Sequence, residues 1–408
     1  MPTRTSGRNF RFDRSVLAMA CVPFAMVLGN SIIIPVLPAI KSALGLTEVT
    51  SGLIITAFSI PAGVLIPFAG FLADRYGRKA VMVPSLVVYG IGGLVAAAAG
   101  VFLGSGAFGL LMVGRVIQGL GAAGTANIGL ALAGDLYSGA ARGQAMGVLE
   151  ASNGFGKVAS PILGAALGLL AWFAPFFFAS LTIPVAIAVA LWVKEAKPPK
   201  PRPARQYFGS VLRVFSRKGL ALGAAFASAM VALFLLFGVL FYLSTTLEKA
   251  FRLEGVAKGL VLALPVLASA AASYVTGTVL QERVDRRHLV SGGLALIALA
   301  LGSLAVIRSP HYLYAAIFLI GAGSGAALAA LNTLVTSSVP RSERGMITSD
   351  YGAVRFFGVA LGPPLFGLVM GRGEIPLFLG AATLAAAMAV AAFLFVDEKK
   401  LMSGKSAD

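Results

Sequence analysis

Cysteine and histidine are almost absent from this chain, whose 408 residues include one cysteine, Cys21, and two histidines, His288 and His311. A lone cysteine cannot form an internal disulfide, and so few thiol and imidazole groups cannot build a metal cluster. Neither histidine lies in a pattern with serine and aspartate that would indicate nucleophilic catalysis, and no metalloprotease or phosphate-loop motif is present. We therefore expect no metal, no cofactor and no enzymatic activity.

Charged residues are also scarce, at 12% of the chain, compared with about 25% in an average soluble domain. Hydrophobic residues make up 58%, and the mean hydropathy is +0.89. No water-soluble fold of this size hides so much apolar surface, so the solvent of this protein is largely lipid. The net charge of +17 does not indicate nucleic acid, because the basic residues lie in short clusters between apolar runs, as they do in cytoplasmic loops of membrane proteins.

Apolar runs of about 20 residues, the length that crosses a bilayer as a helix, recur along the chain. Turn residues and charges divide the sequence into twelve such runs, at residues 15–40, 50–73, 80–102, 107–133, 143–170, 172–193, 220–247, 256–281, 288–307, 312–338, 346–370 and 375–396. We expect an all-α integral membrane protein with twelve transmembrane helices. The first run is too long for the core of a signal peptide, so we expect it to remain as a helix.

The Lys and Arg residues predict the orientation. With the N-terminus placed in the cytoplasm, 24 of the 33 basic residues fall on the cytoplasmic side and 6 on the other, and three lie inside helices. This bias follows the positive-inside rule and favours an even number of helices. We expect a multi-pass protein of the bacterial inner membrane with both termini in the cytoplasm.

A repeat relates the two halves of the chain. Arg142 and Pro161 recur as Arg344 and Pro363, each pair 202 positions apart, so the fifth run corresponds to the eleventh. A Pro/Lys/Arg-rich stretch lies between the sixth and seventh runs and predicts an extended linker ending in a short surface helix. We expect an N-terminal six-helix bundle, a cytoplasmic linker and a C-terminal six-helix bundle, at residues 1–193, 194–219 and 220–408.

Four segments carry recognisable motifs: GFLADRYGRK at 70–79, LMVGRVIQGLGAA at 111–123, LGNSIIIPVLP at 28–38 and GKVASPILGA at 156–165. The first two resemble signature motifs of the major facilitator superfamily, and the last two resemble segments of its twelve-helix drug:proton antiporters. In the fourth, Ser160 and Ala165 stand where the antiporter pattern has glycines. The resemblance implies two pseudo-symmetric bundles with a substrate site between them, and bacterial multidrug efflux as the activity.

The loop at 70–79 places an acid inside a basic turn. We expect Asp74 to lie against the N-terminal end of a helix of the other half, with Arg142 as a candidate ion-pair partner, and Asp135 to pair with Arg75 or Arg78. Such contacts would hold one conformation and break in the other; the alternative is a plain topogenic loop. The candidate gating residues are Gly70, Asp74, Arg75, Gly77, Arg78, Lys79, Arg142 and Asp135.

Charged residues within the helices form the candidate coupling network: Glu150, Arg115, Asp350, Lys157 and Arg355. A charge in the membrane is costly and faces a cavity or a partner. Glu150 and Lys157 share one face of their helix because they are seven residues apart, so Glu150 is the first candidate for a titrating acid and Asp350 the second. For each of these residues a static structural network is the alternative.

Uncharged polar residues in the helices are candidates for the substrate cavity, although helix–helix hydrogen bonding explains them equally well. They are Asn30, Gln118, Asn127, Asn153, Asn332 and Tyr351. Some pumps of the family carry an acid in the first helix, where this chain has Asn30.

The preferred function is proton-coupled efflux of small amphipathic compounds by antiport. The alternatives are a lipid or glycolipid flippase, an exporter of an anionic metabolite such as a siderophore, as the cations Lys157 and Arg355 suggest, and nutrient uptake. The expected partners are a small-molecule substrate, protons and the lipid bilayer, with no nucleic acid and with the protein as a monomer.

Overall fold

The computed structural model describes residues 14–195, 204–307, 309–340 and 343–402, and within these ranges the regular structure is helical, without strands. The α-helices are α1 Arg14–Ser31, α2 Leu37–Leu44, α3 Glu48–Tyr76, α4 Arg78–Leu103, α5 Phe108–Ala122, α6 Ala126–Leu136, α7 Gly139–Gly168, α8 Ala174–Phe177, α9 Thr182–Trp192, α10 Ala204–Lys249, α11 Gly255–Thr278, α12 Arg286–Leu304, α13 Pro310–Ser337, α14 Arg344–Met370, α15 Glu374–Phe395 and α16 Glu398–Met402.

Three of the predicted spans are interrupted, and the sixth consists of α8 and α9 joined by the 3₁₀ turn Phe178–Leu181. The first is α1 and α2 joined by a 3₁₀ turn, Ile34–Val36, where Pro35 lacks the N–H that a continuous helix needs. The fourth breaks at Ala123–Thr125 into α5 and α6, after a glycine-rich stretch with low helix propensity. Sequence hydropathy misses these breaks because the residues around them stay apolar.

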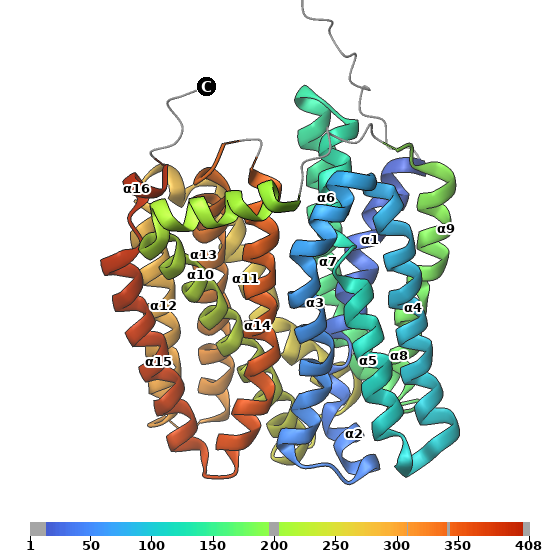
Figure 1. Cartoon of the computed structure of the whole chain (residues 1–408). Helices are drawn as coiled ribbons and strands as arrows, with labels where there is room; N and C mark the ends of the chain where they lie inside the picture. The colour runs from blue at the N-terminus through green and yellow to red at the C-terminus, as the bar shows by residue number, and fades with distance from the viewer. Residues whose placement is uncertain (1–13, 196–203, 308, 341–342, 403–408) are drawn as a thin grey trace, which may run out of the picture.

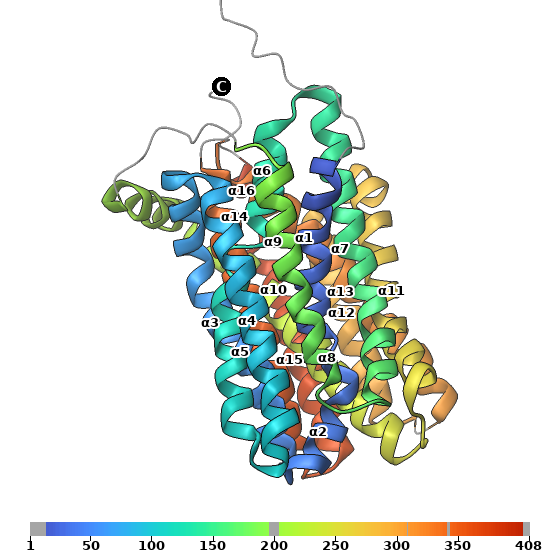
Figure 2. The same cartoon turned by 90° about the vertical axis from the view of Figure 1, so that its right-hand side faces the viewer.

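Eleven helical segments of the described chain are long and apolar enough to cross a membrane. The predicted fifth span, α7, is not one of them because its sequence contains several polar and charged residues. Its 30 residues are nevertheless about 45 Å long at 1.5 Å per residue. It runs beside α1 and α11 in the middle of the bundle (Figure 2).

The helices form two groups, α1–α9 and α10–α16, which stand side by side in Figure 1. They meet along two seams, α3 against α14 and α7 against α11. We call the end of the bundle that holds α16 and the start of α10 the linker end, and the end that holds α2 the opposite end (Figure 1).

Small residues bring the halves together toward the opposite end. A Cβ on Gly52 of α3 would lie 2.6 Å from the backbone nitrogen of Pro364 in α14, and one on Gly259 of α11 would lie 2.7 Å from Cα of Ile162 in α7. Neither glycine leaves room for a side chain, so backbone packs on backbone at both seams, as in other close membrane helix pairs.

The predicted linker differs from the structure at its C-terminal side. Its residues 196–203 lie outside the described residues, and α10 begins at Ala204 without an interruption before its transmembrane part. The start of α10 lies across the linker end in Figure 1. Lys218 fixes it there by donating to the carbonyls of Ser338, at 2.7 Å, and Leu401, at 2.6 Å.

Candidate functional site

The loop between α3 and α4 forms a cluster of charges at the linker end. Arg78 pairs with Asp74 at 2.8 Å and with Asp135 of α6 at 3.1 Å, so the predicted pairing of Asp135 with this loop is confirmed. Gly77 joins the two helices with φ of 109°, in a region that other residues rarely adopt. Arg75 lies over the ring of Tyr76, 5.5 Å from its centroid, and Gly70 lies one turn earlier in α3.

Lys79 ties this loop to the end of the first half. Its ammonium donates to the carbonyls of Ala190 and Val193, and its backbone N–H donates to the carboxylate of Glu195. Glu195 was not among the residues predicted from the sequence to belong to this cluster. An acid directly before the basic linker is the signal that would have suggested it.

The expected ion pair between Asp74 and Arg142 is wrong. Among the described residues Asp74 pairs with Arg78, whereas the Arg142 guanidinium lies against Gly134, 3.1 Å from where a Cβ would be. Asp74 and Arg142 belong to the same half, but the short connection between α6 and α7 holds the Arg142 side chain against α6.

Arg115 is a fully buried packing centre of the N-terminal half, with 0% of its surface exposed. Its Nε donates to the carbonyl of Ile54 at 3.1 Å, its Nη1 donates to Gln118, and its guanidinium lies 4.5 Å from the ring centroid of Phe58. Gln118 in turn reaches the carbonyl of Gly29 at 3.5 Å. Arg115 and Gln118 thus join α5 to α3 and α1, and the structure places neither in contact with Glu150.

The remaining network residues lie on α7 and α14. The Lys157 ammonium interacts electrostatically with the Arg355 guanidinium of the other half and with the Glu150 carboxylate of its own helix. Glu150 and Lys157 are exposed and Arg355 is half-buried. Tyr351 lies under Arg355, with the guanidinium carbon 5.5 Å from its ring centroid. Lys157 therefore lies within electrostatic range of Glu150 on its own helix and of Arg355 across the boundary between the halves.

Several buried polar atoms on these helices have no hydrogen-bond partner: Oδ1 of Asn30, Oδ1 of Asn153, Oδ2 of Asp350, the hydroxyl of Tyr351 and Nε of Arg355. Buried polar groups are normally satisfied, so each of these calls for a water, a proton or a ligand. These five atoms lie on α1, α7 and α14, which were predicted to line the cavity or to carry the network. Other buried atoms without partners among the described residues, such as Nη2 of Arg115, lie on further helices.

Two of the predicted cavity residues, Asn127 and Asn332, lie on other helices, α6 and α13. Asn127 of α6 reaches across to α14, where its Nδ2 is 3.2 Å from the position of a Cβ on Gly352. Asn332 is exposed on α13, and among the described residues no hydrogen bond of its side chain links it to the cluster.

The opposite end carries charges that the sequence argument treated as loop residues. Glu48 of α3 pairs with Lys41 of α2 and, at 3.0 Å, with Lys249 of α10, which joins the two halves. Next to it, Ser244 of α10 donates to the carbonyl of Ile34 at 2.8 Å.

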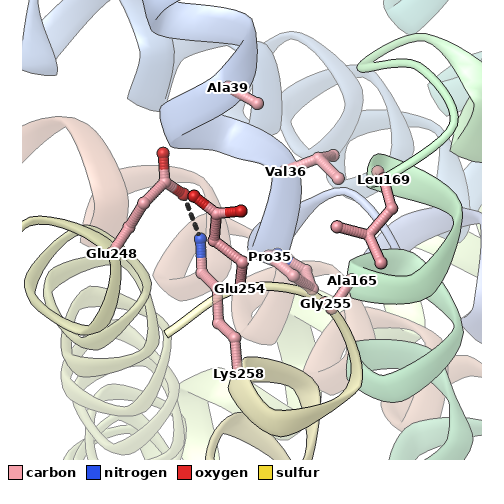
Figure 3. A pocket seen from close by; sticks show the side chains of 10 residues that line it. Pro35, Val36, Ala39, Ala165, Leu169, Glu248, Glu254, Gly255 and Lys258 are labelled. Atoms are coloured by element: carbon pink, nitrogen blue, oxygen red, sulfur yellow. Dashed lines mark hydrogen bonds and ion pairs between the residues drawn. The ribbon is translucent and has the colours of Figure 1, made fainter. Parts of the chain in front are cut away.

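A pocket of about 180 Å³ opens beside these contacts (Figure 3). Pro35, Val36 and Ala165 line it from one half, and the ion pair of Lys258 with Glu248, at 2.6 Å, lines it from the other. The side chain of Lys258 is only 3% exposed. This volume holds a few water molecules, well below the roughly 300–1,000 Å³ of a drug-sized site.

The sequence model of the Major Facilitator Superfamily matches residues 19–280 and 225–407. The chain belongs to the major facilitator superfamily. The predicted membership of this superfamily is confirmed, and so is the predicted fold of twelve membrane helices in two six-helix bundles. This superfamily member is a multi-pass membrane transporter rather than an enzyme.

Two curated relatives of this transporter are exporters by name. The bacillibactin exporter of Bacillus subtilis (strain 168) is 37% identical over 393 residues, which cover 95% of this chain and 97% of the relative. The multidrug efflux protein YfmO of the same organism is 29% identical over a match that covers 86% of this chain and 85% of that relative. Among solved structures, a D-xylose-proton symporter has a TM-score of 0.75 at 14% identity and covers 95% of this chain and 98% of its own, which supports the fold alone.

Proposed function

We propose that this transporter exports small amphipathic compounds by antiport with protons, through alternating access of its two halves. One observation carries the proposal: charged side chains of α7 and α14, one helix from each half, lie within electrostatic range of one another in an apolar bundle, and buried polar atoms on both helices have no partner among the described residues. Intramembrane charges of this kind mark substrate and proton pathways. The names of the two relatives support export as the direction.

Two acids are the candidate proton carriers. Glu150 stays a candidate because it interacts with Lys157, but it is exposed. Asp350 is half-buried with an unpartnered carboxylate oxygen, which a proton would satisfy. We therefore propose Asp350 as the main carrier and Glu150 as the modulator of Lys157.

The predicted orientation belongs to the same proposal. With the linker end in the cytoplasm of a bacterium, the loop charges around Arg78 are cytoplasmic, and the contacts of Glu48 close the outer side. A proton that returns through about 100 mV supplies about 2.3 kcal/mol. We propose a monomer divided at residues 193 and 219, whose halves rock about the central charges.

The test is substrate-driven proton movement in proteoliposomes that contain a pH dye. Wild type, Asp350→Asn and Glu150→Gln are compared, with 1-naphthoate and ethidium added in turn. We expect substrate-dependent proton flux in wild type, its loss in Asp350→Asn and partial retention in Glu150→Gln.

A matched control is Glu374→Gln. This acid lies at the opposite end, where its carboxylate accepts a hydrogen bond from Tyr242 at 2.6 Å, and its removal should leave proton flux intact. Full flux in Asp350→Asn would remove Asp350 as the carrier. Wild-type flux that responds to no added compound would contradict antiport and favour a lipid substrate.

The second candidate substrate class is an anionic metabolite. Lys157 and Arg355 favour it by their position, and the relative named as a bacillibactin exporter supports it.

A further inference from the structure

Lys157 and Arg355 are two cations on membrane helices that have no ion-pair partner in the described part of the chain. Each lies in the middle third of its helix, Lys157 in α7 and Arg355 in α14. They come from opposite halves, and the charge on each is felt by the other. Their closeness is unfavourable unless something negative lies between them.

Glu150 is the one carboxylate whose charge acts on Lys157. With Asp350 protonated, as proposed above, two cations and one carboxylate leave one positive charge in the cluster. Charges within membrane helices pair with one another or face a cavity, so the remaining positive charge leaves a place for one negative group. A ligand with a single anionic group would complete the cluster.

The surroundings describe the rest of that ligand. Tyr351 stacks beneath Arg355 and packs against Phe226, with ring centroids 5.5 Å apart. The unpartnered atoms nearby are an acceptor on Asn153 and a hydroxyl on Tyr351, and Arg355 offers an unpartnered Nε–H. These groups suit an amphipathic aromatic acid. The planar guanidinium can donate to both oxygens of a carboxylate, and the aromatic and hydrogen-bonding groups suit the rest of such a molecule.

We propose that Lys157 and Arg355 together bind the anionic group of an amphipathic substrate, a carboxylate or an acidic phenol, with one cation supplied by each half. This inference rests on the proposed export function and names its substrate class. The anion removes the repulsion between the two cations, so the loaded transporter brings its halves together at this level more easily than the empty one. The substrate itself thereby favours the conformational change that carries it across.

The test is equilibrium binding to the purified full-length protein by isothermal titration calorimetry. Three probes of nearly equal shape differ in charge: 1-naphthoate, 1-naphthamide and 1-naphthylmethylammonium. We expect 1-naphthoate to bind at least tenfold more tightly than the other two. We expect Lys157→Met and Arg355→Gln each to weaken its binding by roughly tenfold or more, the effect of losing a hydrogen bond to a charged group.

Controls separate a lost site from a damaged fold. Lys157→Arg keeps the charge and should retain most of the affinity, and Arg372→Gln removes an exposed cation outside the cluster and should leave it unchanged. Equal binding of acid and amide, or unaltered 1-naphthoate binding in both Lys157→Met and Arg355→Gln, would overturn the proposal. Preferred binding of the ammonium would overturn it as well.

The binding result and the proton-flux result test two different proposals, and either can fail without the other. Tight, Lys157-dependent binding of 1-naphthoate without proton flux would uphold the anion site and contradict antiport. Proton flux driven by ethidium alone, without 1-naphthoate binding, would uphold antiport and contradict the anion site.

Discussion

Arg115 shows how an intramembrane charge is stabilised without an acid. Its guanidinium donates to a backbone carbonyl and to Gln118 and lies over Phe58. Sequence reasoning left open whether this arginine relays protons or locks helices, and the contacts favour the second role. The choice of a carbonyl as partner was beyond sequence reasoning, because every residue carries one.

We therefore predict that Arg115→Lys destabilises the protein. Lysine cannot reach both Ile54 and Gln118 with a planar fork, and each buried polar group left unpaired costs about 1–3 kcal/mol. The measurement is the midpoint of thermal unfolding in detergent, where Gln118→Met should show a smaller decrease. An unchanged midpoint combined with lost transport would instead assign Arg115 a direct part in transport.

Single residues also show what sequence could predict in the candidate site. The pairing of Asp135 with Arg78 was predictable because a basic turn and a nearby acid belong to one half. The pairing of Glu48 with Lys249 was not, because 201 positions separate them and the contact depends on how the two halves pack against each other. The error over Arg142 has a different cause, since Asp74 and Arg142 lie in one half and the contact of Arg142 with α6 depends on local packing.

At the level of helices, hydropathy predicted the spans well because the bilayer demands about 20 apolar residues for each crossing. It could not predict the break between α5 and α6 or the early start of α10, since these depend on packing and on polar backbone contacts. The polar helix α7 was found by its length and by the repeat that relates it to α14, not by hydropathy alone.

The end of α10 is the element that closes the opposite end, through Ser244 and Lys249. We predict that Glu48→Gln weakens this closure and shifts the transporter toward opening there. The reporter is Ala165→Cys in a Cys21→Ala background, because Ala165 is 5% exposed and lines the pocket of Figure 3. A membrane-impermeant maleimide added at the opposite end should label it several-fold faster in Glu48→Gln.

Glu374→Gln is the control for this experiment, since it removes an acid at the same end that bonds within its own half to Tyr242. Its labelling rate should match the parent. Equal rates in Glu48→Gln and the parent would show that the Glu48–Lys249 pair does not hold the end closed.

The glycine seam between α7 and α11 gives a second prediction at this scale. Gly259→Val places a side chain where Ile162 and the carbonyl of Pro161 already lie within 2.7 Å, so the helices must separate. We expect faster labelling of Ala165→Cys and slower export, measured as substrate-driven proton flux. Gly277→Val, at the linker-end side of the same helix with open space around it, should change neither quantity.

The two halves together explain why so few charges suffice for this protein. We propose that loop cations set the orientation, that close-packed glycines form the moving seams, and that the cluster of Glu150, Lys157, Arg355 and Asp350 lies at the level where the halves meet. The division into halves was predictable from the repeat. Which end of the transporter is closed was not predictable, because the states closed at either end have the same sequence and the same spans.

The most direct test of this account is gradient-driven transport by the wild-type protein in proteoliposomes whose interior is made acidic, with transporters labelled to select those whose linker end faces out. We predict that 1-naphthoate or ethidium accumulates inside above its external concentration, and that a protonophore abolishes the accumulation. Equilibration of both compounds without accumulation, or accumulation that persists with the protonophore, would contradict proton-coupled export.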